Sequence, residues 1–170
     1  SCNVYFWEVA KQIGYERIRK IAHAFGFGNP VGWFDDEKSG LVPTNEWKIK
    51  HHQHSWGTGD TFNTCIGQGY LLATPLQMWR MVSIIAGRGK AMSPEILRYD
   101  DATSRPSTIH APIVFPDKYY DYLHKGMSGV FSSPMGTAHR HRLPGDSWQL
   151  AGKTGTVQLL TYHGTNMRNG

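Results

Sequence analysis

The sequence predicts a fold of the mixed α/β class, of the α+β type, in which helices accompany strand structure. Apolar residues recur at helical spacing in the first part of the chain, and again over 75–86 and 116–131. Residues 149–160 form the clearest extended pattern, which is typical of a strand. Because one strand cannot satisfy its own backbone donors and acceptors, the pattern also predicts an incomplete domain.

Two helices separated by a glycine are predicted at the start of the chain. An apolar run over 4–10 predicts the beginning of a buried helix, which Gly14 interrupts. Apolar residues then recur at helical spacing over 18–25, and Gly26 and Gly28 end the second helix.

Residues 29–64 show no sustained periodicity and are rich in Gly, Pro, Asp, Ser and His. They predict a long surface loop, which we expect to pack through Trp33, Trp47 and Trp56. Loops of this length without regular structure usually have a functional or partner-related reason.

A third helix is predicted to start at Thr74 and Pro75, with Thr as the N-cap and Pro at the first helical position. We expect its apolar face to include Leu76, Trp79 and Val82. Residues 90–115 predict extended segments and turns.

A fourth helix is predicted over 116–131, and a loop over 132–147 leads to the predicted strand. The inward residues of this helix are predicted to be Tyr120, Leu123, Met127 and Val130.

Composition is typical of a globular chain. The 170 residues are 39% hydrophobic with a mean hydropathy of -0.45, and no run of about eighteen apolar residues or signal peptide is present. The net charge of +5 could favour an anionic partner, but the basic residues are scattered and no nucleic-acid motif accompanies them. We therefore predict no nucleic-acid partner, and at most a mild attraction to acidic lipid or cell-wall polymer.

Cys2 and Cys65 allow one disulfide at most. Each lies in an apolar context, so two buried free thiols and one bridge both remain open.

His51, His52 and His54 are spaced closely enough to suggest zinc ligands. No cysteine or carboxylate follows at the usual spacing, and the nearest acid, Asp60, lies in a glycine-rich turn. We predict no metal site, and zinc binding by these histidines stays the less favoured alternative.

Two short motifs carry the chemistry. Lys153-Thr154-Gly155-Thr156 places a cation, a hydroxyl and a residue without a side chain on an extended segment. Lys153 and Thr154 can then offer charge and a hydrogen bond to a carboxylate, Gly155 lets a substrate backbone approach, and the Thr156 N–H can face an oxyanion.

The second motif is Ser1-Cys2-Asn3, directly before the first apolar run. At the start of a helix, Ser1 and Asn3 can face a cleft, or either can simply cap the helix. Ser-x-Asn and Lys-Thr-Gly are two of the three marks of penicillin-recognising serine enzymes.

Further segments match that class in one order along the chain. With the two motifs, they are Ser1–Phe6, Phe25–Gly28, Gly59–Thr61, Ile66–Tyr70, Ala73–Met78, Gly136–His139 and Ala151–Thr156. On these segments nearly the whole chain resembles the transpeptidase domain of class B penicillin-binding proteins, most closely the elongation type, penicillin-binding protein 2. The resemblance implies a penicillin-recognising serine transpeptidase fold, an antiparallel sheet flanked by helices that is incomplete in this chain, with Lys153 on a strand beside the cleft.

The first mark of the family, Ser-x-x-Lys, is missing, because no serine in the chain has a lysine three residues on. That segment would carry the nucleophile and its base. The resemblance therefore implies that residues 1–170 are the central part of a transpeptidase domain, truncated at both ends and inactive in isolation.

The resemblance implies a D,D-transpeptidase that crosslinks peptidoglycan stem peptides during cell-wall elongation and is acylated by β-lactams. The implied catalytic residues are Ser1, Asn3, Lys153 and Thr156, and the implied substrate-binding residues are Thr154, Gly155 and Thr156. His139 is a candidate for a role near the cleft, with a structural hydrogen bond favoured over catalysis. Tyr70 and Trp148 are packing or cleft-wall aromatics.

The implied partners are a stem peptide ending in D-Ala-D-Ala, β-lactam antibiotics, a membrane glycosyltransferase and other elongation-complex proteins. The resemblance places the catalytic domain in the periplasm of a protein anchored in the inner membrane, and implies no cofactor. Two alternatives stay open: a serine β-lactamase or penicillin-sensing receptor, and a non-catalytic module that binds cell wall or a partner.

Overall fold

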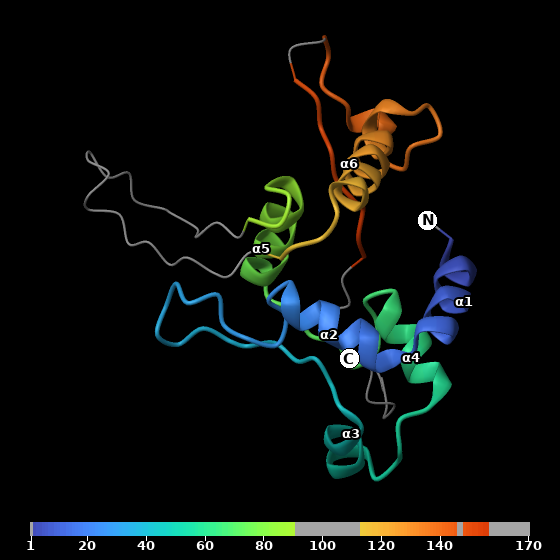
Figure 1. Cartoon of the computed structure of the whole chain (residues 1–170), viewed down its shortest axis with the longest axis vertical. Helices are drawn as coiled ribbons and strands as arrows, with labels where there is room; N and C mark the ends of the chain where they lie inside the picture. Colours follow the sequence, from blue (N-terminus) through green and yellow to red (C-terminus); the bar gives the residue numbers. More distant parts are fainter. Residues whose placement is uncertain (1, 91–112, 146–147, 157–170) are drawn as a thin grey trace, which may run out of the picture. The chain divides into compact units, whose positions relative to one another are not determined.

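The computed structural model describes residues 2–90, 113–145 and 148–156, and its regular structure is helical (Figure 1). The chain divides into two units, residues 1–126 and 127–170, and each is described by itself. The elements in chain order are α1 (Asn3–Ile13), α2 (Tyr15–Ala24), α3 (Asn45–His52), α4 (Thr58–Cys65), α5 (Pro75–Ala86), α6 (Asp117–Ser132) and the 3-10 turn η2 (His139–His141). No helix among the described residues is long and apolar enough to cross a membrane.

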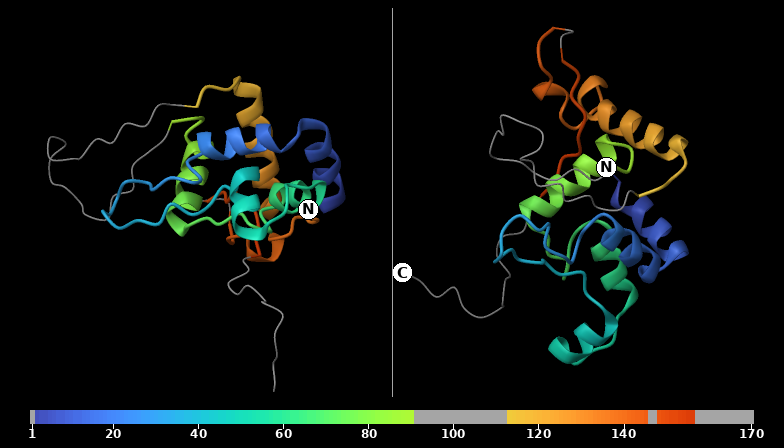
Figure 2. Two further views of the ribbon diagram at one scale, coloured as in Figure 1. Left: turned by 90° about the horizontal axis from the view of Figure 1, so that it is seen from below. Right: turned by 60° about the vertical axis from the view of Figure 1, so that its left-hand side comes forward.

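The two predicted N-terminal helices are confirmed. Gly14 separates α1 from α2 with a φ of 77°, a value that glycine adopts without strain, and its N–H donates to the Ala10 carbonyl at 2.9 Å. Helices α1, α2 and α4 pack against one another (Figures 1 and 2). Ala10 is buried, and Trp7 of α1 stacks on Phe62 of α4, with ring centroids 6.0 Å apart.

The prediction of a loop without regular structure over 29–64 is wrong, because α3 and α4 form within it. Polar side chains cap both helices. The Thr44 hydroxyl accepts the Trp47 N–H at 3.0 Å, and the Asp60 carboxylate accepts the Gly57 N–H at 2.7 Å. Each helix has 8 residues, too few for a periodic apolar pattern to emerge.

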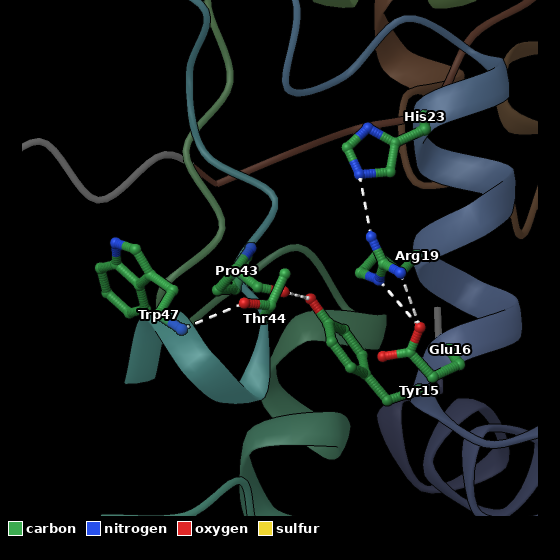
Figure 3. A network of polar contacts seen from close by, with 7 residues as sticks. All are labelled: Tyr15, Glu16, Arg19, His23, Pro43, Thr44 and Trp47. Atoms are coloured by element: carbon green, nitrogen blue, oxygen red, sulfur yellow. Dashed lines mark hydrogen bonds and ion pairs between the residues drawn. The ribbon is translucent and has the colours of Figure 1, made fainter. Parts of the chain in front are cut away.

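Tyr15 fixes the chain just before α3 (Figure 3). Its hydroxyl donates to the Pro43 carbonyl, and its ring stacks on Trp56 at 4.0 Å, as expected for a packing tryptophan. Burial raises the pKa of Tyr15 to about 12, the Arg19 charge opposing this and Glu16 adding to it. One turn along α2, Arg19 forms an ion pair with Glu16 at 2.8 Å (Figure 3).

An ion pair joins α3 to α4. The Lys48 Nζ lies 2.5 Å from Asp60 Oδ2, and the two side chains are only 11% and 15% exposed. Burial raises the pKa of Asp60, but hydrogen bonds from Lys48 and the Gly57 N–H outweigh it, so the pKa lies below its ordinary value.

This pair predicts a loss of stability in acid. The unfolded-state pKa of an aspartate is about 3.9, so the stabilisation is fully present above that pH and is lost as pH falls through the lower folded-state pKa. Asp60→Asn should therefore flatten the decline in the free energy of unfolding below about pH 4, measured by urea unfolding over a pH series. Asp35 is exposed, and Asp35→Asn is the control, which should show the same decline of the free energy of unfolding as the parent. A decline in Asp60→Asn parallel to that of the parent would contradict the prediction.

Gln77 of α5 ties the segment over 29–41 to the N-terminal end of that helix. It is fully buried, its Nε2 donates to the Asn29 and Ser39 carbonyls at 2.8 and 2.7 Å, and its Oε1 accepts the Thr74 N–H at 2.9 Å. The Thr74 hydroxyl in turn accepts the Gln77 N–H at 3.2 Å, which confirms the predicted N-cap.

The apolar face predicted for α5 is wrong in part. Trp79 and Val82 are 39% and 43% exposed, whereas Gln77 and Ile84 are the buried residues of this helix. Burying Gln77 is favourable because all of its side-chain hydrogen-bonding groups find partners, so a polar residue lies where the pattern favoured apolar ones.

Glu37 closes the turn over 31–37. Its carboxylate accepts four successive backbone N–H groups, those of Val31, Gly32, Trp33 and Phe34, at 2.5–3.1 Å. Burial raises the pKa of Glu37, and the four amide donors together lower it below its ordinary value. The ring of Trp33 lies against that of its neighbour Phe34, with 4.8 Å between the ring centroids.

Helix α6 is confirmed close to its predicted bounds. Tyr120 is buried as expected, with its hydroxyl donating to the Ile113 carbonyl at 2.8 Å, and Met127 and Val130 are half-buried. Leu123, predicted to face inward, is 41% exposed. Of the predicted extended region over 90–115, residues 91–112 lie outside the described residues.

The predicted strand over 149–160 is not formed in its described part, which ends at 156. A strand needs a neighbouring backbone, and the Gly152 N–H donates instead to the Met127 carbonyl of α6 at 3.0 Å. In the described chain the one β-bridge joins Leu41 to Leu72, antiparallel, with N–H to carbonyl distances of 2.8 and 3.0 Å.

Both cysteines are free thiols, so the alternative of a disulfide between Cys2 and Cys65 is wrong. Cys2 is exposed, contrary to the expectation of burial, and Cys65 is half-buried. Burial raises the pKa of the Cys65 thiol, which contacts the Phe62 carbonyl at 3.1 Å.

Candidate active site

Asn3 of the Ser-x-Asn motif is the first residue of α1, as predicted. Cys2 occupies the N-cap position in an extended conformation, without a side-chain capping hydrogen bond. The Asn3 side chain is exposed, so it is accessible to a ligand. Ser1 lies outside the described residues.

The Lys-Thr-Gly segment lies in the second unit and is exposed from Lys153 to Thr156. The Lys153 Nζ donates to the Thr154 carbonyl at 2.6 Å, and the Thr154 hydroxyl lies 3.1 Å from the Thr137 hydroxyl. The segment thus presents an ammonium group and a hydroxyl together on an accessible surface, the two groups expected to bind a carboxylate.

The C-terminal end of α6 anchors this segment. The Gly152 N–H donates to the Met127 carbonyl at 3.0 Å, and a Cβ on Gly152 would lie 3.2 Å from the Phe131 ring. A backbone carbonyl oxygen has two lone pairs, so a carbonyl within α6 can also accept the N–H of a following segment. Lys153 therefore directly follows a residue that is held to a rigid helix.

The Gly-Thr-Ala-His segment also binds the end of α6. The Ala138 N–H donates to the Val130 carbonyl at 3.0 Å, and Ala138 is buried. A Cβ on Gly136 would lie 2.3 Å from the Val130 carbonyl oxygen and 2.5 Å from that of Gly129, so only glycine fits there. Two segments well separated in the sequence are thus fixed by one helix end.

His139 has a structural hydrogen bond, as the sequence favoured. Its Nδ1 lies 3.0 Å from the Phe131 carbonyl, and its Nε2 is in contact with the Arg142 guanidinium. Both ring nitrogens are therefore engaged in holding the loop after α6.

The histidines of α3 pack with aromatic rings. The ring centroid of Trp47 lies 4.7 Å from that of His51 and 5.4 Å from that of His52. The ring centroids of His52 and Tyr70 are 4.5 Å apart. Tyr70 thus packs on the rings of Trp47 and His52, and Trp148 is 76% exposed. A place for either residue in a cleft wall stays a prediction. Among the described residues no group of three or more His, Cys, Asp or Glu side chains is arranged to hold a metal ion.

Asn3 belongs to the first unit and Lys153 to the second. Their meeting at one cleft with Ser1 stays a prediction. Sequence reasoning missed the contact between Thr137 and Thr154. The one signal for it was the Gly-Thr-Ala-His segment, which the resemblance singled out without giving Thr137 a role.

A family model decides the relationship. The model of the penicillin binding protein transpeptidase domain matches residues 1–170, the whole chain. The chain belongs to this family. The resemblance seen in the motifs is thereby confirmed, and the fold is that of penicillin-binding protein transpeptidase domains.

Members of the family with known names and structures agree. Peptidoglycan D,D-transpeptidase MrdA of Salmonella typhimurium is 33% identical over 170 residues, covering 95% of this chain. The structure of penicillin-binding protein PBP2 from Helicobacter pylori has a TM-score of 0.79 and 36% identity over 92% of this chain. A complex of PBP2 and MreC from Helicobacter pylori has a TM-score of 0.77 and 37% identity, also over 92% of this chain.

These relatives are considerably longer than the chain. It spans 27% of the Salmonella transpeptidase and 29% of the PBP2 chain in either Helicobacter structure.

Proposed function

We propose that residues 1–170 are the central part of the transpeptidase domain of an elongation-type class B penicillin-binding protein, a peptidoglycan D,D-transpeptidase. The match of the family model to the whole chain is the single observation that carries this proposal. The names of the relatives support the elongation type, and the accessible Lys153-Thr154 pair supports recognition of a carboxylate-bearing substrate.

The proposed reaction is an acyl transfer through a covalent enzyme intermediate. A serine of an upstream Ser-x-x-Lys segment attacks the carbonyl between the last two D-alanines of a stem peptide, and the lysine of that segment takes the serine proton. The bond to the terminal D-alanine breaks, and this residue leaves as the amine. An amine of a neighbouring stem peptide then attacks the ester, which forms the crosslink and releases the serine.

The residues of this chain assist that reaction. Ser1 relays a proton to the leaving amine or modulates the base, and Asn3 holds the amide of the substrate. Lys153 supplies positive potential and orients Ser1, while the hydroxyls of Thr154 and Thr156 bind the terminal carboxylate. Gly155 lets the substrate backbone approach, and the Thr156 N–H contributes to the oxyanion hole.

We further propose the cellular setting that the relatives suggest. The catalytic domain lies in the periplasm of a protein anchored in the inner membrane. The complex of Helicobacter pylori PBP2 with MreC supports an elongation-complex partner. A membrane glycosyltransferase is the other partner that we propose. β-Lactams mimic the D-Ala-D-Ala end and acylate the same serine.

Covalent labelling by a fluorescent penicillin tests the proposal. The protein that contains this chain with the upstream Ser-x-x-Lys segment should carry a stable fluorescent band on a denaturing gel, because its acyl-enzyme ester persists. Residues 1–170 alone should carry none, since the nucleophile is not among them. The matched control is the longer protein with its Ser-x-x-Lys serine changed to alanine.

Each outcome separates one alternative. Label on residues 1–170 alone would overturn the fragment hypothesis. Label on the longer protein that disappears within seconds to minutes would favour a β-lactamase, and a complete lack of label would favour a non-catalytic module.

A further inference from the structure

Two hydroxyl groups meet beside the Lys-Thr-Gly segment. The Oγ1 atoms of Thr137 and Thr154 lie 3.1 Å apart, and both residues are exposed although 17 positions separate them in the sequence. Thr137 thus brings a polar atom from the Gly-Thr-Ala-His segment to a side chain proposed to bind substrate.

The position of Thr137 is fixed on both sides. Gly136 before it lies so close to the Gly129 and Val130 carbonyls that a Cβ would not fit. Ala138 after it is 6% exposed and donates its N–H to the Val130 carbonyl. The main chain at Thr137 therefore has little freedom, and its hydroxyl is held where Thr154 can reach it.

The number of protons determines the direction of this hydrogen bond when substrate is bound. A threonine hydroxyl has one proton to donate and two lone pairs, whereas an ionised carboxylate only accepts. If Thr154 donates its proton to a substrate carboxylate, the hydrogen bond between the two threonines must run from the Thr137 O–H to Thr154 Oγ1. A donor on Thr154 Oγ1 also polarises its O–H, which strengthens the hydrogen bond to the carboxylate.

We propose that Thr137 is a positioning residue, whose hydroxyl donates to Thr154 Oγ1 and so directs the Thr154 proton toward the carboxylate of the substrate. This inference rests on the proposed function, and it adds a residue to which the Lys-Thr-Gly chemistry alone assigns no role. Thr137 itself does not touch the substrate. It acts on substrate binding more than on bond breaking.

Acylation kinetics of the longer penicillin-binding protein test the inference. Thr137→Val keeps the shape of the side chain but removes the hydroxyl, whereas Thr137→Ser keeps a hydroxyl at the same place. With a fluorescent penicillin, Thr137→Val should raise the half-saturating concentration about three- to tenfold, the effect of losing one neutral hydrogen bond, with the maximal acylation rate nearly unchanged. Thr137→Ser should restore most of the parental value.

A double-mutant cycle shows whether Thr137 acts through Thr154. In a Thr154→Val background the further change Thr137→Val should have almost no effect, because the group that Thr137 orients is already gone. Thermal unfolding of every variant checks the fold, and Thr137→Ala replaces Thr137→Val if the latter does not fold.

The results separate the inference from the proposed function. A parental protein that penicillin does not label overturns the proposed function, and the inference with it. Normal labelling of the parent together with independent, multiplying effects of the two substitutions overturns the inference alone. A fall in the maximal acylation rate without a change in the half-saturating concentration also overturns the inference. If neither Thr137→Val nor Thr137→Ala folds, Thr137 is a purely structural residue and the inference is again overturned.

Discussion

Lys153→Ala should lower the rate of acylation by β-lactams by roughly a hundredfold or more in the longer protein, the scale expected when a positioned catalytic group is lost. The Lys153 ammonium is exposed directly after Gly152, whose N–H is held by the Met127 carbonyl, so its charge is presented from a fixed point. Under the proposed function this charge serves both carboxylate binding and proton transfer through Ser1. The measurement is the second-order rate constant of acylation by a fluorescent penicillin.

Two variants serve as controls for this loss. Lys153→Arg should recover part of the rate, because the charge survives while the geometry of the donor changes. Lys125→Ala removes an exposed lysine of α6 and should acylate at the parental rate. If Lys153→Ala reacts as fast as the parent with its fold intact, the Lys-Thr-Gly segment has no part in catalysis.

Gln77→Leu should reduce the free energy of unfolding by about 2–4 kcal/mol, since several buried polar groups lose their partners at once. The change conserves volume approximately but leaves the Asn29 and Ser39 carbonyls and the Thr74 N–H without the bonds seen at 2.7–2.9 Å. Urea unfolding measures the loss.

The control for Gln77 is an exposed glutamine. Gln12→Leu on α1 removes the same amide where water can replace its hydrogen bonds, and its effect should stay within about 0.5 kcal/mol. A loss below about 1 kcal/mol for Gln77→Leu would mean that the segment over 29–41 relaxes without its anchor.

Local chemistry explains where the sequence predicted helices correctly. Gly14 separates two helices because its positive φ suits glycine, and Thr74 with Pro75 starts a helix because the hydroxyl and the ring suit its first turn. Such signals act over a few residues. They can be recognised without knowing what lies beside them in space.

The same reasoning missed α3 and α4 because neither helix depends on an apolar stripe. Each relies on a capped first turn, and Lys48 and Asp60 then join the two through an ion pair. For residues 149–156 the prediction of a strand was wrong for a different reason. The extended pattern was visible in the sequence, but a strand requires a partner backbone, and the Gly152 N–H binds a carbonyl of α6 instead.

By itself, the sequence determined the family, through a series of short motifs in a fixed order along the chain. It also determined the position of Asn3 at the start of a helix and the succession of charge and hydroxyl at Lys153 and Thr154, because these depend on residues adjacent in the chain. Only the tertiary structure decided that Gln77 is buried and that Thr137 meets Thr154. Both features depend on contacts between positions distant in sequence. The energies of those contacts depend on distances and burial that no local pattern of residues specifies.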